Sequence, residues 1–274
     1  MSPAPADRSA DAKTRGAEFW DALDVQAHVI GALIMRELHT RYGRENIGYL
    51  WMLLEPGLLA AAVAAMHIGG ARHGSELSPI GFALGGYCTF IIFRSIVSRA
   101  ETVLLANQPL LYHRTVTIFD MLAARAVLEA LSTIATLALL LAGACALGLA
   151  EPPARPLVFG AAILLLVWLS FAISLSVCAA TYVSKAVAKF VHPLMYLLMP
   201  ISGAFFLLAW IPQPFRGWLA WSPLTQIFEL LHTGQFRSFE SPYVDPVYIV
   251  GWCLALTLVG LLAIRVVRRH LHLS

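Results

Sequence analysis

Charge is what this sequence has least of. Charged side chains make up 13% of its 274 residues and hydrophobic ones 59%, and the mean hydropathy is +0.73. An average soluble domain carries roughly 25% charged residues, so this chain has too few to cover a surface in water. The composition therefore excludes disordered, collagen-like and disulfide-rich secreted proteins and a conventional soluble enzyme. It predicts that apolar surface faces lipid.

Lysine is scarcer still. A nucleotide-binding P-loop needs Gly-Lys followed by Ser or Thr, so that the backbone amides and the lysine hold the phosphates. Lys13, Lys185 and Lys189 follow Ala12, Ser184 and Ala188, and none fits that motif. If ATP drives this protein, another subunit binds the ATP and its Mg²⁺.

Other chemical signatures are also missing. The four cysteines stand singly in apolar stretches, as membrane-packing residues do. The sequence has no Gly-x-Ser-x-Gly elbow and no His-Glu-x-x-His helix, and the net charge of +3 is small. We therefore expect no catalytic residue, metal or cofactor in this chain, and no nucleic-acid partner.

Six segments have the length and apolar character of membrane spans. A transmembrane helix needs roughly 20 mostly apolar residues, and proline is tolerated there better than in soluble helices. The sequence thus predicts an all-α membrane protein with six spans, at residues 47–71, 79–93, 126–150, 156–184, 190–211 and 246–264.

The cations are distributed unevenly between the two sides of these spans. With both termini in the cytoplasm, 15 of the 19 Lys and Arg residues lie on the cytoplasmic side, and four lie outside: Arg72, Arg155, Arg216 and Arg237. Cytoplasmic loops carry the excess of cations. This bias predicts a multi-pass protein with both termini in the cytoplasm.

Two segments flank the spans. Residues 28–46 place apolar and basic side chains on separate stripes, which favours a helix in the cytoplasmic interface; the alternative is an extension of the first span into water. Residues 212–235 are rich in Trp and Pro and too short to cross, so they predict re-entrant or interfacial helices, or a plain aromatic belt. Residues 1–27 and 265–274 complete the chain as a polar tail and a basic tail.

Two carboxylates fall within predicted spans, where ionisable groups are costly and mark function by default. Glu129 lies one turn after Arg125, a spacing that allows an ion pair; a transport role is the alternative. Glu55 precedes Pro56 in the first span. It would either neutralise a nearby arginine or gate a polar path.

Three stretches of the sequence carry recognisable motifs. Residues 36–56 read RELHTRYGRENIGYLWMLLEP, residues 107–125 read NQPLLYHRTVTIFDMLAAR, and residues 221–236 read WSPLTQIFELLHTGQF. Together they resemble the membrane permeases of ABC-type polysaccharide exporters, especially the capsular-polysaccharide branch. The first stretch resembles the family's signature, the second is similar to its cytoplasmic segment between spans two and three, and the third resembles the segment before its last span. Ser222 and His232 depart from the family's common Asn and Arg.

The resemblance implies a homodimer in the bacterial inner membrane, paired with two copies of a separate ABC ATPase. It implies export of a lipid-linked polysaccharide, with a periplasmic co-polymerase and an outer-membrane exporter continuing the route. Within the same superfamily, O-antigen, teichoic acid or a small molecule would be alternative substrates. An alternative from a different class of protein is an intramembrane enzyme, which would be active without an ATPase.

The resemblance and the residue types together predict three groups of functional residues. Residues that couple to the ATPase would be Arg36, Arg41, Arg44, Asn107, Leu110, Tyr112, His113 and Arg114. Because sugars stack on aromatic rings, the path or gate would be lined by Tyr49, Trp51, Glu55, Tyr87, Tyr196, Trp210, Trp221 and Glu229. An anionic substrate would enter past Arg41, Arg44 and Arg94.

Overall fold

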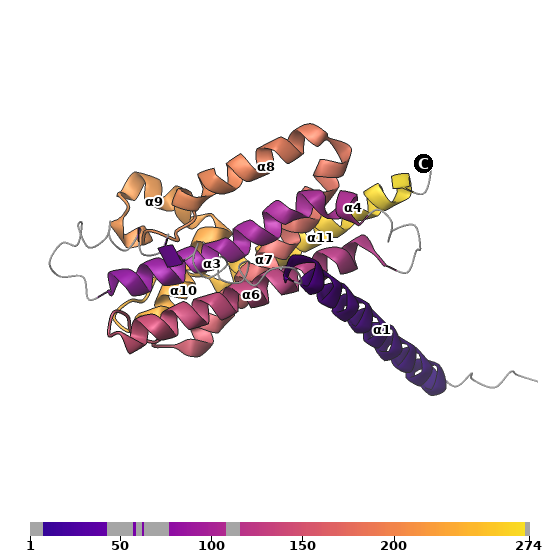
Figure 1. Cartoon of the computed structure of the whole chain (residues 1–274), viewed down its shortest axis with the longest axis horizontal. Coiled ribbons are helices and arrows are strands. Elements are labelled where there is room, and N and C mark those ends of the chain that lie inside the picture. The colour runs from indigo at the N-terminus through magenta and orange to yellow at the C-terminus, as the bar shows by residue number, and fades with distance from the viewer. Residues whose placement is uncertain (1–7, 43–56, 59–61, 63–76, 108–115, 272–274) are drawn as a thin grey trace, which may run out of the picture.

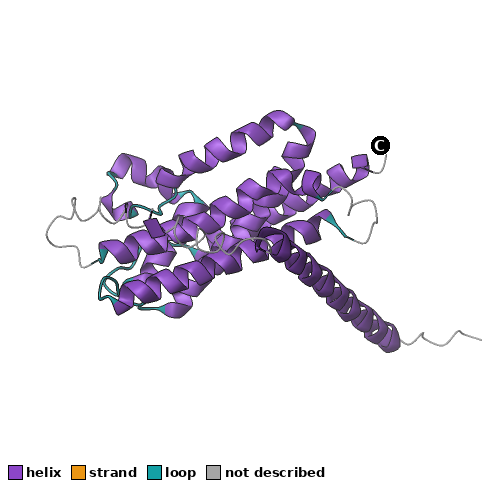
Figure 2. Ribbon diagram, in the orientation of Figure 1, coloured by secondary structure: helices purple, strands orange, loops and turns teal. Residues whose placement is uncertain are grey.

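The computed structural model describes residues 8–42, 57–58, 62, 77–107 and 116–271. Within these ranges all regular structure is helical (Figure 2). The helices are α1 (Arg8–Tyr42), α3 (Pro79–Arg99), η1 (Ala100–Thr102), α4 (Val103–Ala106), α6 (Ile118–Ala146), α7 (Pro156–Val183), α8 (Lys185–Leu198), η2 (Met199–Ile201), η3 (Leu208–Trp210), α9 (Gln213–Ala220), α10 (Pro223–Gln235) and α11 (Pro246–Leu271).

Four helices of the described part are long and apolar enough to cross a membrane. They cover Pro79–Thr102, Ile118–Ala146, Pro156–Val183 and Pro246–Arg269, and correspond to the predicted spans two, three, four and six. The first predicted span lies almost entirely outside the described residues. The all-helical class is thus confirmed, whereas the count of six spans stays a prediction.

Local sequence signals fix where these helices begin. Ser78 caps α3, its Oγ accepting a hydrogen bond from the Gly81 N–H at 3.2 Å, and Pro79 follows in the first turn. Thr117 and Asp120 form a reciprocal capping box at the start of α6. A side-chain cap followed by proline satisfies or removes the amide donors that an N-terminus leaves without partners.

Helix α7 lies at the centre of the bundle and contacts α3, α6, α8, α10 and α11 (Figure 1). A stripe of fully buried side chains at helical spacing explains this position: Ala162, Leu166, Leu169, Ala172 and Leu175. One polar bond crosses to α11, where Trp168 Nε1 donates to Thr257 Oγ1 at 3.1 Å. By contrast, many large apolar side chains of α11 are exposed, as expected of a surface that faces lipid.

Most described cations gather at one end of this bundle, at the right in Figure 1, where α3, α7 and α11 end and α6 and α8 begin. The helix termini place Arg99, Arg125, Lys185, Lys189 and Arg268 at this end. The opposite end, with α9, α10 and the α6–α7 loop, carries Arg155, Arg216 and Arg237. We call the first the basic end and the second the outer end.

The expected helix over residues 190–211 is interrupted in the structure. Helix α8 begins earlier, at Lys185, contains Pro193, and passes into η2 at Met199. Pro200 cannot donate a backbone hydrogen bond, and Gly203 has φ +90°, a conformation that favours glycine. The chain therefore leaves the helix before η3 and Pro212.

The N-terminal helix is also longer than predicted. Helix α1 spans 35 residues from Arg8, so the boundary expected at residue 28 between a tail and a helix is wrong. Part of the polar segment counted as tail continues the helix, because it contains no proline after Pro5 and one glycine, Gly16, before residue 28. In Figure 1 the N-terminal half of α1 lies clear of the bundle.

Candidate functional site

Helix α1 meets the bundle at its basic end, against α6. Leu33 is buried there with Val103 and Leu104 of α4, Met121 and Ala124 of α6, and Val267 of α11. Apolar contact is non-directional, so this cluster holds α1 against the bundle without fixing its angle. Four polar contacts, described next, orient the helices that meet here, and we call the whole region the α1 junction.

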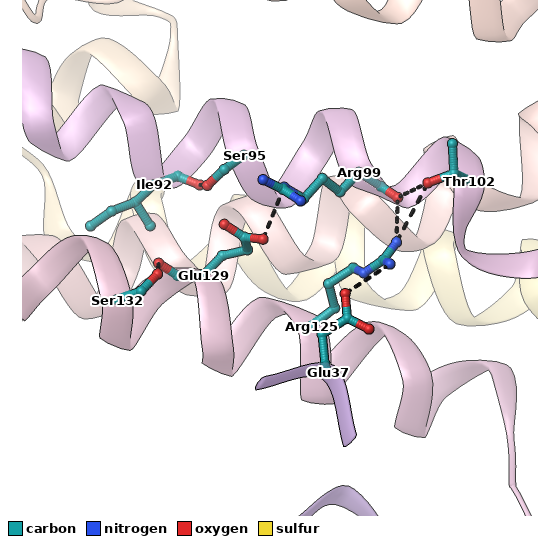
Figure 3. Close-up of polar contacts among 8 residues, drawn as sticks. All are labelled: Glu37, Ile92, Ser95, Arg99, Thr102, Arg125, Glu129 and Ser132. Carbon is teal, nitrogen blue, oxygen red and sulfur yellow. Dashed lines mark hydrogen bonds and ion pairs between the residues drawn. The ribbon is translucent and has the colours of Figure 1, made fainter. Parts of the chain in front are cut away.

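The central contact of the α1 junction is an ion pair between α1 and α6. Arg125 Nη2 lies 3.1 Å from Glu37 Oε1, and the two side chains are only 15% and 19% exposed. Through Nη1 the same guanidinium donates to the Arg99 carbonyl at 3.2 Å and reaches Thr102 Oγ1 at 3.5 Å (Figure 3). Because guanidinium donors form a rigid fork, one side chain of α6 holds α1 and the end of α3 together.

Glu129 forms the second ion pair, with a different partner from the one the spacing suggests. Its Oε1 lies 2.9 Å from Arg99 Nε, and its side chain is 6% exposed. The predicted pair with Arg125 is therefore wrong: Arg125 turns toward α1, while Arg99 reaches Glu129 from α3 (Figure 3). An intramembrane carboxylate is thus paired between two helices, which supports the structural alternative for Glu129.

A third contact joins α1 to the start of α6. Gln26 Nε2 donates to Asp120 Oδ1 at 2.8 Å. The other oxygen, Asp120 Oδ2, accepts from the Thr117 N–H at 3.0 Å. The carboxylate that caps α6 therefore also holds α1.

Arg36 and Asn107, both predicted to couple to the ATPase, are in contact. Arg36 Nη2 donates to Asn107 Oδ1, and Asn107 Nδ2 donates to the Val103 carbonyl at 2.9 Å. Beside them lies a small cleft of about 10 Å³, open to solvent and with room for about one water molecule, lined by Leu33, Arg36, Glu37, Asn107, Met121, Ala124 and Arg125. Arg41 lies near the end of α1, and Arg44, Leu110, Tyr112, His113 and Arg114 lie outside the described residues.

Arg94 and Tyr196, predicted for the entrance and the path, also meet. Arg94 Nη2 donates to Tyr196 Oη at 3.1 Å, and its guanidinium carbon lies 4.5 Å from the ring centroid. The pair joins α3 to α8, and Tyr196 is exposed. A guanidinium over an aromatic face is stabilising, so Arg94 is already engaged within the chain.

The other predicted path residues are separated in space and environment. Tyr87 is buried in the core of the chain, with its ring centroid 6.1 Å from that of Phe205. Trp210 and Trp221 are exposed at the outer end, and the Trp221 carbonyl accepts a bond from Tyr248 Oη at 2.7 Å. Tyr49, Trp51 and Glu55 lie outside the described residues.

Glu229 lies buried on α10 at the outer end. Its Oε1 accepts a 2.7 Å hydrogen bond from the Leu208 N–H, which ties α10 to η3. Burial raises the pKa of Glu229, while contacts with Ser241 and the Leu208 N–H oppose the shift. This carboxylate supports the broken segment before α9.

His232 lies one turn further along α10. Its ring stacks on Phe82 of α3 with centroids 4.3 Å apart, and Nε2 donates to the Gly203 carbonyl at 3.3 Å. Complete burial lowers the pKa of His232 to about 4, although the Gly203 contact opposes the shift. His232 is therefore neutral near pH 7, and α10 is held to both α3 and the helix break.

Sequence reasoning missed four residues of the α1 junction: Gln26, Glu37, Arg99 as the partner of Glu129, and Asp120 as a contact of α1. Each contact joins residues far apart in the chain; Glu37 and Arg125 are 88 positions apart. A local signal existed only for Asp120, through its capping-box spacing after Thr117. In the described ranges, no three His, Cys, Asp or Glu side chains are grouped to hold a metal ion.

A bundle of apolar helices long enough to span a bilayer, with ion pairs between helices at its basic end, defines a helical membrane protein. The family follows from sequence comparison. Residues 28–236 match the ABC-2 type transporter family, and the chain belongs to that family. It is accordingly a transport subunit, and the resemblance noted in its sequence motifs is confirmed.

Relatives align with most of the chain. The capsule polysaccharide export inner-membrane protein CtrC of Neisseria meningitidis serogroup B is 34% identical over 245 residues, 89% of this chain and 92% of the relative. BexB of Haemophilus influenzae, with the same description, is 33% identical over 248 residues, covering 90% and 94%. The polysialic acid transport protein KpsM of Escherichia coli is 31% identical over 243 residues, covering 87% and 93%.

Proposed function

We propose that this chain is the permease of an ATP-driven exporter that moves a lipid-linked capsular polysaccharide across the bacterial inner membrane. The observation that carries the proposal is similarity over 87–90% of this chain to two capsule polysaccharide export inner-membrane proteins and a polysialic acid transport protein. Membership of the ABC-2 type transporter family supports it. The absence of a P-loop lysine supports a separate subunit that binds ATP and Mg²⁺.

The proposed assembly has two copies of this chain and two copies of the ATPase. Each chain crosses the membrane six times with both termini in the cytoplasm, which the positive-inside bias of the sequence supports. The basic end then faces the ATPase, and the outer end faces the periplasm. There a polysaccharide co-polymerase, followed by an outer-membrane exporter, would continue the route.

The proposed roles of individual residues follow this orientation. Arg36, Asn107 and the segment that follows Asn107 receive the movement of the ATPase. Exposed aromatic side chains such as Tyr196, Trp210 and Trp221 offer faces on which sugars stack. Arg94, at the same side as the α1 junction, suits an anionic substrate entering from the cytoplasm.

The proposal is tested by deleting the gene in its native host and restoring it on a plasmid. We expect the deletion to abolish surface polysaccharide and to leave polymer inside the cell, because synthesis continues without export. Restoration of the gene should return polymer to the surface, whereas a gene carrying an early stop codon should not. Normal surface polysaccharide in the deletion strain would refute the proposal.

The same experiment separates the alternative substrates. Loss of O-antigen or of a teichoic-acid polymer, with capsule unchanged, would assign the chain to another polymer of the same superfamily. Activity of the purified chain on a lipid or peptide without any ATPase would instead indicate an intramembrane enzyme. Full-length similarity to capsule export proteins favours the first proposal.

A further inference from the structure

The α1 junction lies where two proposed ATPase-facing elements meet. One is α1, and the other is the η1–α4 segment that ends at Asn107. Under the proposed function, both transmit the movement of the ATPase to the spans. How the two elements are joined therefore decides whether they act separately or together.

Arg125 is the side chain common to both elements. It projects from α6, pairs with Glu37 of α1 through Nη2, and holds the Arg99 carbonyl at the end of α3 through Nη1 (Figure 3). Eight residues after Arg99 the chain reaches Asn107, which accepts a bond from Arg36 of α1. These contacts form a closed loop through α1, α6, the end of α3 and α4.

Apolar packing and polar contacts share this loop. Leu33 is buried against α4 and α6, and the small open cleft beside it is lined by Arg36, Glu37, Asn107 and Arg125. Apolar contact is non-directional, so the polar contacts define the angle of α1 against the bundle.

The Arg99–Glu129 ion pair continues the connection between α3 and α6 beyond Arg125. It joins α3 to α6 one helical turn beyond Arg125 and is nearly buried on its Glu129 side. A displacement of α3 relative to α6 would separate this pair at a cost, because a buried carboxylate would lose its partner. Movement delivered to Arg125 therefore reaches α3 and α6 together.

We propose that Arg125 and Glu37 are positioning residues that join α1 and the η1–α4 segment ending at Asn107 into one coupling unit, so that an ATPase movement at either element shifts α3 and α6 as a pair. The inference rests on the proposed function, because it assigns a coupling role within an ATP-driven exporter. Neither residue is in the set predicted from the sequence to contact the ATPase. Both act through the elements that they join.

The test uses the full complex of this chain with its ATPase, in vesicles loaded with the lipid-linked polysaccharide. Glu37→Gln, Arg125→Gln and the double variant are compared for polymer exported per ATP hydrolysed. We expect each single variant to lower this ratio about fivefold to tenfold, in the lower part of the range for coupling between sites. The double variant should be no worse than Arg125→Gln, because Arg125→Gln already removes the contact with Glu37.

Two further variants separate coupling from simple loss of structure. Arg268→Gln removes an exposed arginine from the same end of the bundle and should leave the ratio unchanged. The charge exchange Glu37→Arg with Arg125→Glu restores the ion pair without the bond to the Arg99 carbonyl, and should recover part of the ratio. Copurification of the ATPase with each variant reports assembly.

Three outcomes are decisive. An unchanged ratio in both single variants, or additive losses in the double variant, would overturn the inference while the proposed function stands. If Arg125→Gln does not assemble, Glu37→Gln alone decides, because the expected loss in ratio is the same. If the unmodified complex hydrolyses ATP and exports no polysaccharide, the proposed function itself fails.

Discussion

The residues of the α1 junction show how a few polar side chains orient apolar helices. Arg125 uses two terminal nitrogens to reach three oxygens, one each on α1, α3 and η1. A lysine has one ammonium on a flexible stem and cannot reproduce this fork. Arginine at this position thus fixes an angle between helices, in addition to supplying a charge.

At the outer end, one buried residue gives a prediction for pH dependence. The pKa of His232 is about 4 in the folded chain and 6.5 ordinarily. The unfolded chain therefore binds more protons between these values, so stability falls as the pH falls through this window. By pH 5 the free energy of unfolding should have dropped by about 2 kcal/mol through this residue alone.

The measurement is the unfolding midpoint of the detergent-solubilised protein between pH 7 and pH 5. The control is His232→Gln, whose amide can still donate to the Gly203 carbonyl but does not titrate. The variant should lose less stability over this range than the unmodified protein. Equal losses in the two proteins would show that His232 does not titrate as its burial requires.

Contacts between residues that are distant in the chain could not be predicted from the sequence. Glu129 was recognisable as a costly carboxylate within a span, and its need for a cation followed from that cost. Whether Arg125 or Arg99 pairs with Glu129 depends on how α3 and α1 pack against α6. The roles of Tyr87 and Tyr196 differ for the same reason, since packing buries one aromatic ring and exposes the other.

At the scale of the elements, α10 is wedged between α3 and α7. A Cβ atom on Gly234 would lie 2.5 Å from the Phe159 backbone nitrogen, and one on Gly85 would lie 2.0 Å from Gln235 Oε1. Gln235 also donates to the Gly81 carbonyl at 2.6 Å. Helix α10 is therefore a fixed part of the bundle, in contrast to α9, which buries no side chain.

This close approach predicts that Gly234→Ala destabilises the protein. The added methyl group meets backbone atoms of α7, which cannot rotate away, so the helices must separate. Overpacking of this kind costs about 1–3 kcal/mol. The measurement is the unfolding midpoint in detergent, compared with that of Gly251→Ala in α11.

Gly251 is a matched control because a Cβ atom there would meet nothing within 4 Å. The same chemical change should leave stability unchanged or raise it slightly, since alanine favours the helix more than glycine does. A similar loss in both variants would mean that the effect does not come from contact with α7.

The interrupted helix and the long α1 mark the limits of reading elements from sequence. Four long apolar stretches of the sequence form four helices in the structure, because the length and apolar character that a span needs can be read from the sequence. Pro193 and Pro200 were both expected to be tolerated, yet one lies inside α8 and the other in η2. The chain turns away from the helix after Pro200, where Gly203 has a positive φ and Gly86 of α3 approaches the Ala204 carbonyl closely.

For the whole molecule, the separation of charge between the two ends predicts the orientation in the membrane. Glu151 lies exposed in the α6–α7 loop at the outer end, and Lys185 lies exposed where α8 begins at the basic end. In a variant without the native cysteines, we expect Glu151→Cys to react with an impermeant maleimide in intact spheroplasts. Lys185→Cys should react only after the membrane is opened.

The two positions serve as controls for each other, because both are exposed and they lie at opposite ends of the bundle. Labelling of Lys185→Cys in intact spheroplasts, with Glu151→Cys protected, would show that the orientation is the opposite of the one expected. Labelling at both sites before the membrane is opened would contradict the assignment of the ends altogether. The expected pattern would place both ends of the chain with the ATPase.

The shape of α1 has a mechanical consequence. Ahead of Gln26, which bonds to Asp120 of α6, lie 18 residues of helix, a rod of about 27 Å at a rise of ~1.5 Å per residue. Because Gln26, Leu33 and Glu37 hold its C-terminal half, the rod acts as a lever: its tip sweeps a wide arc while these contacts barely shift. A partner that moves this tip over a long distance would therefore move the spans over a short distance with a larger force.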